Sequence, residues 1–230
     1  MQENTELPIS PDSSSPTSTS SVLPMEGLIT PCAETVATTP NPINAESGGY
    51  GEYQRIYEWV YEQHPNYGST IRAGSLDLAA LLAWPDRPIV DVGCGSLAFL
   101  GALRSITNPA INLLGIDVVQ PLNNPAGVRF ARCPAWGLAD VISNVGVVCC
   151  FDVLEHLTED DLPRTFAAWH RAMAAGAYLI ATIACRPSSH RGPEDQNLHL
   201  TIRPAEWWRA RLSEWFVDVR PAMGFWTARR

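Results

Sequence analysis

The chain has 230 residues, of which 46% are hydrophobic, so it can bury one sizeable core, and its formal net charge is -8. Six acidic residues and no basic residue lie in the first 47 positions, which leaves 16 basic against 18 acidic residues elsewhere. This nearly neutral remainder argues against a protein that grips a nucleic-acid backbone, because such proteins carry a basic face.

The choice of residue types excludes several further classes. All 16 basic residues are arginine, so the chain has neither a P-loop lysine nor a Schiff-base lysine. The six cysteines include no C-x-x-C pair, which indicates reduced thiols, and we expect no metal site. No apolar run is long enough to span a membrane, and no secretory signal precedes the chain's first apolar segments. We therefore expect a cytoplasmic protein without membrane association.

Composition divides the chain into three parts. Residues 1–47 are rich in Ser, Thr, Pro and Asn and predict a disordered tail, because they offer little apolar surface to offset the entropy of ordering. Residues 48–84 predict a helical segment that could serve as a lid. Residues 85–230 predict the folded core.

Aromatic residues mark the first expected helix, at residues 52–64, which ends before a proline. A second helix is expected at residues 73–83, again before a proline. The apolar face of the first helix consists of Tyr53, Tyr57, Val60 and Tyr61. Such a face either packs on the core or covers a ligand pocket. In the second case Tyr53, Tyr57 and the nearby Tyr67 are candidate substrate contacts.

Strand-like runs then alternate with connecting segments, as in an α/β fold with a parallel sheet. A helical stripe from Asp160 to Met173 predicts a helix, with Gly176 as its C-cap. Residues 215–221 and 224–230 predict an antiparallel terminal pair. The expected parallel strands occupy residues 88–92, 112–117, 128–132, 145–151 and 177–184.

The stretch "IVDVGCGSLAFL", residues 89–100, predicts a strand that runs into a glycine loop and then a helix. In doubly wound sheets, ligands lie at the carboxyl ends of the strands, where glycine lets backbone and ligand approach closely. Gly93 and Gly95 suit that role. Asp117 ends the next strand, about 20 positions after the loop, where a carboxylate can accept hydrogen bonds from ribose hydroxyls.

These motifs resemble those of the class I S-adenosylmethionine-dependent methyltransferases, and specifically the small-molecule type (methyltransferase type 11/12/23-like). The resemblance lies in "VDVGCG", in "GID" and in "FDVLEHL" at residues 151–157, and it extends to the downstream "HLTIRPAEWW" and "WFVDV". It covers about residues 85–230.

The resemblance implies a Rossmann-like, three-layer α-β-α fold with seven strands, the last of them antiparallel. The implied cofactor is S-adenosyl-L-methionine. Asp91 would orient the loop, Asp117 and Val118 would lie at the ribose, and Asp152 and Val153 near the methyl donor. The methionine portion would lie on the backbone of Gly93, Cys94 and Gly95.

Two departures from the family pattern stand out. Leu97 replaces a glycine that is frequent in the family, so the packing of loop against helix must differ. After the third strand the chain reads "RFARCPAWG", without the acidic residue that often contacts adenine. Cys133, Pro134 and Trp136 occupy that neighbourhood, and Asp140 is a more distant candidate.

Methyl transfer requires alignment of the acceptor and, in some reactions, removal of a proton. Glu155 and His156 are the candidate catalytic residues, although "LEHL" could equally cap the following turn; His199 is a further candidate, at the substrate. Trp207 and Trp208 either pack in the core or contact substrate.

The acceptor is expected to be a small molecule. The segment after the fourth strand lacks both the proline-aromatic motif of amino-group DNA methyltransferases and the Pro-Cys nucleophile of cytosine-C5 enzymes. A nucleic-acid base-modifying enzyme still remains an alternative. So do a catalytically silent Rossmann-like binding protein and an NAD-dependent oxidoreductase, whose pattern would need glycine at Ala98. The oligomeric state is left open.

Overall fold

The structure, a computed structural model, describes residues 49–222 and 224–230. The tail predicted at residues 1–47 lies outside this part of the chain. No helix in the described part is both long and apolar enough to cross a membrane.

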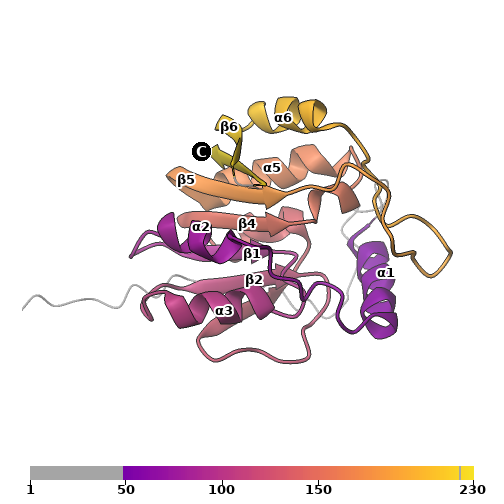
Figure 1. Cartoon of the computed structure of the whole chain (residues 1–230), viewed down its shortest axis with the longest axis horizontal. Coiled ribbons are helices and arrows are strands. Elements are labelled where there is room, and N and C mark those ends of the chain that lie inside the picture. The colour runs from indigo at the N-terminus through magenta and orange to yellow at the C-terminus, as the bar shows by residue number, and fades with distance from the viewer. Residues whose placement is uncertain (1–48, 223) are drawn as a thin grey trace, which may run out of the picture.

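Seven strands form a single sheet in the order β3-β2-β1-β4-β5-β7-β6 (Figure 1). The first five strands pair in parallel, whereas β7 runs antiparallel to both β5 and β6. The strands are β1 (Ile89–Val92), β2 (Leu113–Asp117), β3 (Val128–Arg132), β4 (Val145–Phe151), β5 (Met173–Thr182), β6 (Val217–Ala222) and β7 (Phe225–Arg229). The predicted sheet is confirmed. Its order reverses between β1 and β4, and at such a switch point the carboxyl ends of the strands form a ligand crevice.

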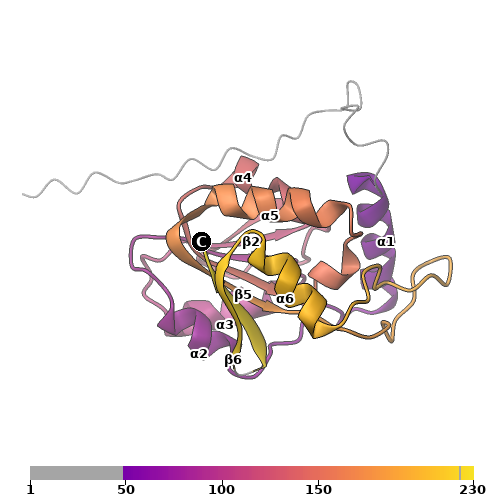
Figure 2. The same ribbon diagram turned by 90° about the horizontal axis from the view of Figure 1, so that it is seen from above.

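Helices cover both faces of this sheet and complete the predicted three layers. On one face lie α2 (Ser75–Leu81) and α3 (Ala98–Ile106), whose Leu100 and Leu103 are fully buried. On the other lie α4 (Leu138–Val141), α5 (Asp161–Ala172) and α6 (Ala205–Ser213). Figure 2 shows α5 and the α2–α3 pair on opposite sides of the sheet. Trp208 of α6 is fully buried between the sheet and the helices on this second face, so it packs in the core.

The prediction that Gly176 caps a helix is wrong. Helix α5 ends at Ala172, and Met173 already pairs with Val145 of β4. Gly176 lies inside β5 with φ of +77°, at a shift in the register between these strands. An irregularity of this kind needs a residue that tolerates a left-handed backbone, which is a second reason for glycine in such a sequence.

Helix α1 (Tyr50–Gln63) stands across the carboxyl ends of the strands, apart from the two helical layers (Figure 1). The buried Tyr53 hydroxyl group donates to Asp161 Oδ2 at 2.8 Å and accepts the Thr158 amide at 3.2 Å. Glu58 pairs with Arg132 at 2.8 Å on the surface. These contacts tie α1 to both halves of the sheet, so the helix covers the crevice.

Candidate functional site

A cavity of about 620 Å³ lies at the carboxyl ends of β1, β2 and β4. The described chain encloses it with α1, the connection that follows α1, and the long segment between β5 and α6. Its volume is typical of sites for small molecules and cofactors. Among the predicted site residues, its walls include Asp91, Gly93, Cys94, Asp117, Val118, Asp152, Val153, Glu155, His156, His199, Tyr53, Tyr57 and Tyr67.

The glycine loop curls tightly over the end of β2. The amides of Gly93 and Cys94 both donate to the Ile116 carbonyl, at 2.8 and 3.1 Å. Gly93 has φ of +72°, and a Cβ there would lie 2.3 Å from Val153 Cγ2. Glycine is therefore needed at this position for both its backbone angle and its lack of a side chain.

Gly95 differs from the other loop residues because it does not reach the cavity wall. A Cβ on Gly95 would lie 2.5 Å from the Gly68 carbonyl oxygen, so the connection after α1 packs directly on it. The sequence indicated the need for glycine here, but only the structure identifies the neighbouring backbone as the cause.

Leu97, which stands where the resemblance led us to expect glycine, has a backbone conformation that glycine adopts without strain. Its φ of +63° is left-handed, which costs a non-glycine residue about 1–2 kcal/mol. Its side chain is fully buried against Gly115 of β2, and burial of a leucine contributes about 1.5–3 kcal/mol. Hydrophobic burial thus offsets the strain, and the loop geometry survives without the glycine.

Substitutions at Leu97 should reverse the usual order of alanine and glycine. We expect Leu97→Ala to lower the free energy of unfolding by about 2–5 kcal/mol through a cavity. Leu97→Gly loses the same contacts but relieves the backbone strain, so it should be about 1 kcal/mol less damaging than alanine. Urea unfolding of both variants checks this. A glycine variant less stable than the alanine variant would show that the left-handed backbone carries no strain.

Asp117 lies at the end of β2 and is 5% exposed. Its Oδ2 accepts the Gly95 amide at 2.9 Å and the Tyr61 hydroxyl group at 3.2 Å, and its Oδ1 accepts the Val119 amide at 3.0 Å. Burial raises the pKa of this carboxyl group, while these hydrogen bonds favour the anion. The carboxylate therefore links the glycine loop to α1.

Asp91 is a second buried carboxyl group in the cavity wall, 3% exposed. Burial, with a smaller contribution from the Asp117 charge, raises its pKa well above the usual range. Among the described residues, no hydrogen bond joins the Asp91 side chain to the glycine loop. No contact of this kind therefore supports the expected role of Asp91 in orienting the loop. Two desolvated carboxyl groups make this end of the cavity favourable for a cationic ligand group.

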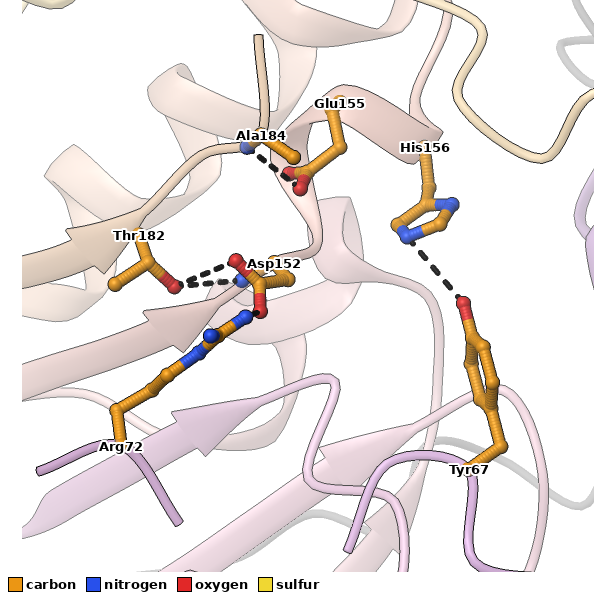
Figure 3. A network of polar contacts seen from close by, with 7 residues as sticks. All are labelled: Tyr67, Arg72, Asp152, Glu155, His156, Thr182 and Ala184. Carbon is orange, nitrogen blue, oxygen red and sulfur yellow. Dashed lines mark hydrogen bonds and ion pairs between the residues drawn. The ribbon is translucent and has the colours of Figure 1, made fainter. Parts of the chain in front are cut away.

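Asp152, directly after β4, also has a left-handed backbone, with φ of +54°. Its carboxylate forms an ion pair with Arg72 and accepts the Thr182 hydroxyl group at 2.9 Å (Figure 3). Arg72 comes from the connection between α1 and α2, so this pair joins that connection to the end of β4 in the cavity wall. The sequence offered no signal for Arg72, which lies 80 positions from its partner.

Glu155 and His156 lie in the short 3-10 helix η3 (Leu154–His156) that follows β4. Glu155 is fully buried, accepts the Ala184 amide at 2.8 Å, and has a pKa raised to about 7 by burial (Figure 3). His156 Nδ1 lies 2.8 Å from the Leu198 carbonyl oxygen. Burial lowers the pKa of His156 to about 4, with a further contribution from His199. Its imidazole ring is therefore neutral near pH 7.

The predicted substrate residues gather around His156. Tyr57 stands edge-on to its ring with centroids 5.7 Å apart, and the Tyr67 hydroxyl group lies 3.5 Å from its Nε2. The His199 ring is 4.7 Å away. Tyr53 lines the cavity, but its hydroxyl group is held by Asp161, so it anchors α1 more than it presents a polar group to a ligand.

Tyr61 was not among the predicted site residues, although it lies one helical turn from Tyr57 on the same face. That spacing was a usable signal. At the other end, Cys133, Pro134 and Trp136 line the cavity after β3, whereas Asp140 on α4 and Trp207 are not part of its wall.

No family model matches the sequence, and no curated protein matches it. Solved structures do share its fold. That of Burkholderia thailandensis 1,6-didemethyltoxoflavin-N1-methyltransferase, with bound 1,6-didemethyltoxoflavin and S-adenosylhomocysteine, matches at a TM-score of 0.59 and 16% identity, covering 90% of this chain and 96% of that one.

Two further matches are S-adenosylmethionine-dependent methyltransferases. The protein from Archaeoglobus fulgidus has a TM-score of 0.53 at 18% identity and covers 71% of this chain and 76% of its own. The protein from Mesorhizobium loti has a TM-score of 0.50 at 16% identity, and the match covers 69% of this chain and 98% of that one. At these identities the likeness establishes the fold, as the resemblance in the motifs predicted.

Proposed function

We propose that this protein, which has the fold of S-adenosylmethionine-dependent methyltransferases, transfers a methyl group from S-adenosyl-L-methionine to a small-molecule acceptor. The observation that carries the proposal is the junction of the glycine loop with the Asp117 carboxylate in the wall of one cavity. A ribose diol matches a buried carboxylate at this position in a doubly wound sheet.

The charges in the cavity support the same donor. The donor carries an ammonium group and a sulfonium group, and Asp91 and Asp117 are buried carboxyl groups at the end of the cavity formed by the glycine loop. A cationic ligand stabilises their anionic forms, which burial otherwise disfavours. The cavity wall at Cys133, Pro134 and Trp136 supplies the surface for the adenine ring.

A small acceptor fits the enclosure better than a nucleic acid does. Four tyrosines and two of the histidines in the cavity wall present their rings to the interior, so an acceptor would bind among aromatic rings. These are Tyr53, Tyr57, Tyr61, Tyr67, His156 and His199. We assign Glu155 and His156 to the activation of that acceptor, since they are the ionisable pair next to Asp152 and Val153.

Calorimetry on the full chain tests the proposal. We expect S-adenosylhomocysteine to bind at micromolar strength, and NAD⁺ not to bind. Binding of NAD⁺ alone would favour the oxidoreductase alternative. No binding of either ligand to folded protein would favour the silent binding protein.

Tyr61 leads to a more specific prediction. Asp117 Oδ2 already accepts the Gly95 amide and the Tyr61 hydroxyl group, so a ribose hydroxyl group that binds this oxygen displaces Tyr61. Tyr61→Phe removes a hydrogen bond worth about 1 kcal/mol from the ligand-free state, so S-adenosylhomocysteine should bind about fivefold more tightly. Calorimetry should show no change in Tyr57→Phe, whose hydroxyl group does not contact Asp117. Weaker binding in Tyr61→Phe would mean that Tyr61 itself contacts the ligand.

A further inference from the structure

Three potential metal ligands converge in the wall of the cavity. One carboxylate oxygen of Glu155 and one ring nitrogen each of His156 and His199 lie within 4.8 Å of one another. The geometry points to a binding site for a divalent cation of the first transition row, formed by these three side chains. The spacing of the cysteines had led us to expect no metal site.

The state of Glu155 supports this assignment. Its side chain is fully buried, Oε1 accepts the Ala184 amide, and Oε2 has no hydrogen-bond partner among the described residues. A buried carboxylate oxygen without a partner costs about 1–3 kcal/mol or more. A bound cation would supply the missing partner.

The histidines are oriented as metal ligands usually are. His156 Nδ1 lies 2.8 Å from the Leu198 carbonyl oxygen, and His199 Nδ1 lies 2.5 Å from the Arg186 carbonyl oxygen. A carbonyl oxygen can only accept, so each Nδ1 carries the proton and each Nε2 keeps its lone pair. This second contact of each ring fixes the ligating tautomer. The 3.5 Å contact of His156 Nε2 with the Tyr67 hydroxyl group is long enough to yield to a cation.

Backbone contacts hold the segment with His199 against η3. The amides of Leu200 and Thr201 both donate to the Glu155 carbonyl oxygen, at 2.8 and 3.0 Å. The buried Thr201 hydroxyl group donates to the Leu157 carbonyl oxygen at 2.7 Å. Ligands 44 positions apart are thus joined by a fixed scaffold, and small side-chain rotations suffice to bring their atoms to a cation.

The ligand set favours one class of cation. Two imidazoles and one carboxylate suit Mn²⁺, Fe²⁺, Co²⁺ or Zn²⁺, whereas Ca²⁺ prefers oxygen ligands alone. Two arginines lie close enough to affect Glu155, but Arg72 is neutralised by Asp152 and Arg186 is exposed. The charges of these two arginines therefore do not prevent a cation from binding at the Glu155 carboxylate.

If the proposed methyl transfer is correct, on which this step rests, the cation identifies the acceptor atom as a hydroxyl oxygen. The ligand positions not filled by protein would face the cavity, and a hydroxyl group bound there becomes more acidic. Its proton leaves to solvent, the oxygen forms a bond to the methyl carbon, and the carbon–sulfur bond breaks with its electron pair left on sulfur. The products are a methyl ether and S-adenosylhomocysteine.

Titration of the full chain with Mn²⁺, followed by the electron paramagnetic resonance of the free ion, tests the site. We expect one Mn²⁺ per chain, displaced by Zn²⁺ and not by Ca²⁺. Glu155→Gln keeps the shape and the Ala184 contact but removes the charge, and we expect it to weaken Mn²⁺ binding at least tenfold. His199→Ala should do the same. His190→Ala is the matched control, because His190 lines the same cavity outside the cluster, and it should bind like the unaltered chain.

Each outcome bears on a separate claim. Equal binding by Glu155→Gln and the unaltered chain, both folded by circular dichroism, would overturn the cation site, as would an equal loss in His190→Ala. Catechol, as a probe of an oxygen acceptor, should change the Mn²⁺ spectrum of the loaded chain; no change would overturn the hydroxyl assignment. Binding of S-adenosylhomocysteine is measured without metal, so failure of the donor site is seen independently.

Discussion

Replacement of Asp117 by alanine is expected to weaken the binding of S-adenosylhomocysteine about 100-fold or more. The carboxylate would accept two hydroxyl groups of the ribose, and hydrogen bonds to a charged group contribute about 1.5–3 kcal/mol each. The side chain is 5% exposed, so water compensates little for its loss. Calorimetry with the full chain measures the change.

Asp140→Ala provides the control for this substitution. Asp140 lies on α4 outside the cavity wall, and its removal should leave the affinity within about twofold. Circular dichroism of the Asp117→Ala variant tests whether this variant is folded. An affinity in Asp117→Ala within about fivefold of the unaltered chain would contradict the assignment of this carboxylate to the ribose.

Replacement of Gly95 by alanine is expected to lower the free energy of unfolding by about 2–5 kcal/mol. The left-handed backbone, with φ of +50°, costs alanine about 1–2 kcal/mol. The new Cβ would also lie 2.5 Å from the Gly68 carbonyl oxygen, and overpacking of this kind adds about 1–3 kcal/mol. Since the clash is with backbone, the connection after α1 has to move. Urea unfolding measures the loss, and faster tryptic cleavage after Arg55 or Arg72 reports the displaced segment.

Gly224→Ala separates the two causes. Gly224 has φ of +86°, but a Cβ there would meet nothing within 4 Å. Gly224→Ala should therefore lower the free energy of unfolding only by the cost of the left-handed backbone, about 1–2 kcal/mol. If Gly95→Ala is no more destabilising than Gly224→Ala, the connection does not press on the glycine loop as the structure has it.

Local pattern in the sequence predicted most of the elements. The apolar runs of β1, β2 and β4 are continuous, as in strands that are buried on both faces, and the apolar residues of α5 recur with the helical period. In both cases neighbouring residues carry the information. The prediction of where α5 ends was wrong, because β5 starts at Met173, which pairs with Val145 of β4. These two residues are 28 positions apart. Propensity near Gly176 could not reveal that pairing.

The predicted site divides in the same way. The sequence by itself determined the glycine loop and the carboxylate of Asp117, because a strand end, a loop and the next strand end form one local unit. It also placed Glu155 and His156 after β4. Only the tertiary structure decided that the Tyr61 hydroxyl group donates to Asp117 and that Arg72 pairs with Asp152. It also decided that His199 lies beside Glu155 and His156. Side chains 43 to 80 positions apart meet where the fold brings strand ends, α1 and the segment after β5 together. No periodicity in the sequence encodes such a meeting.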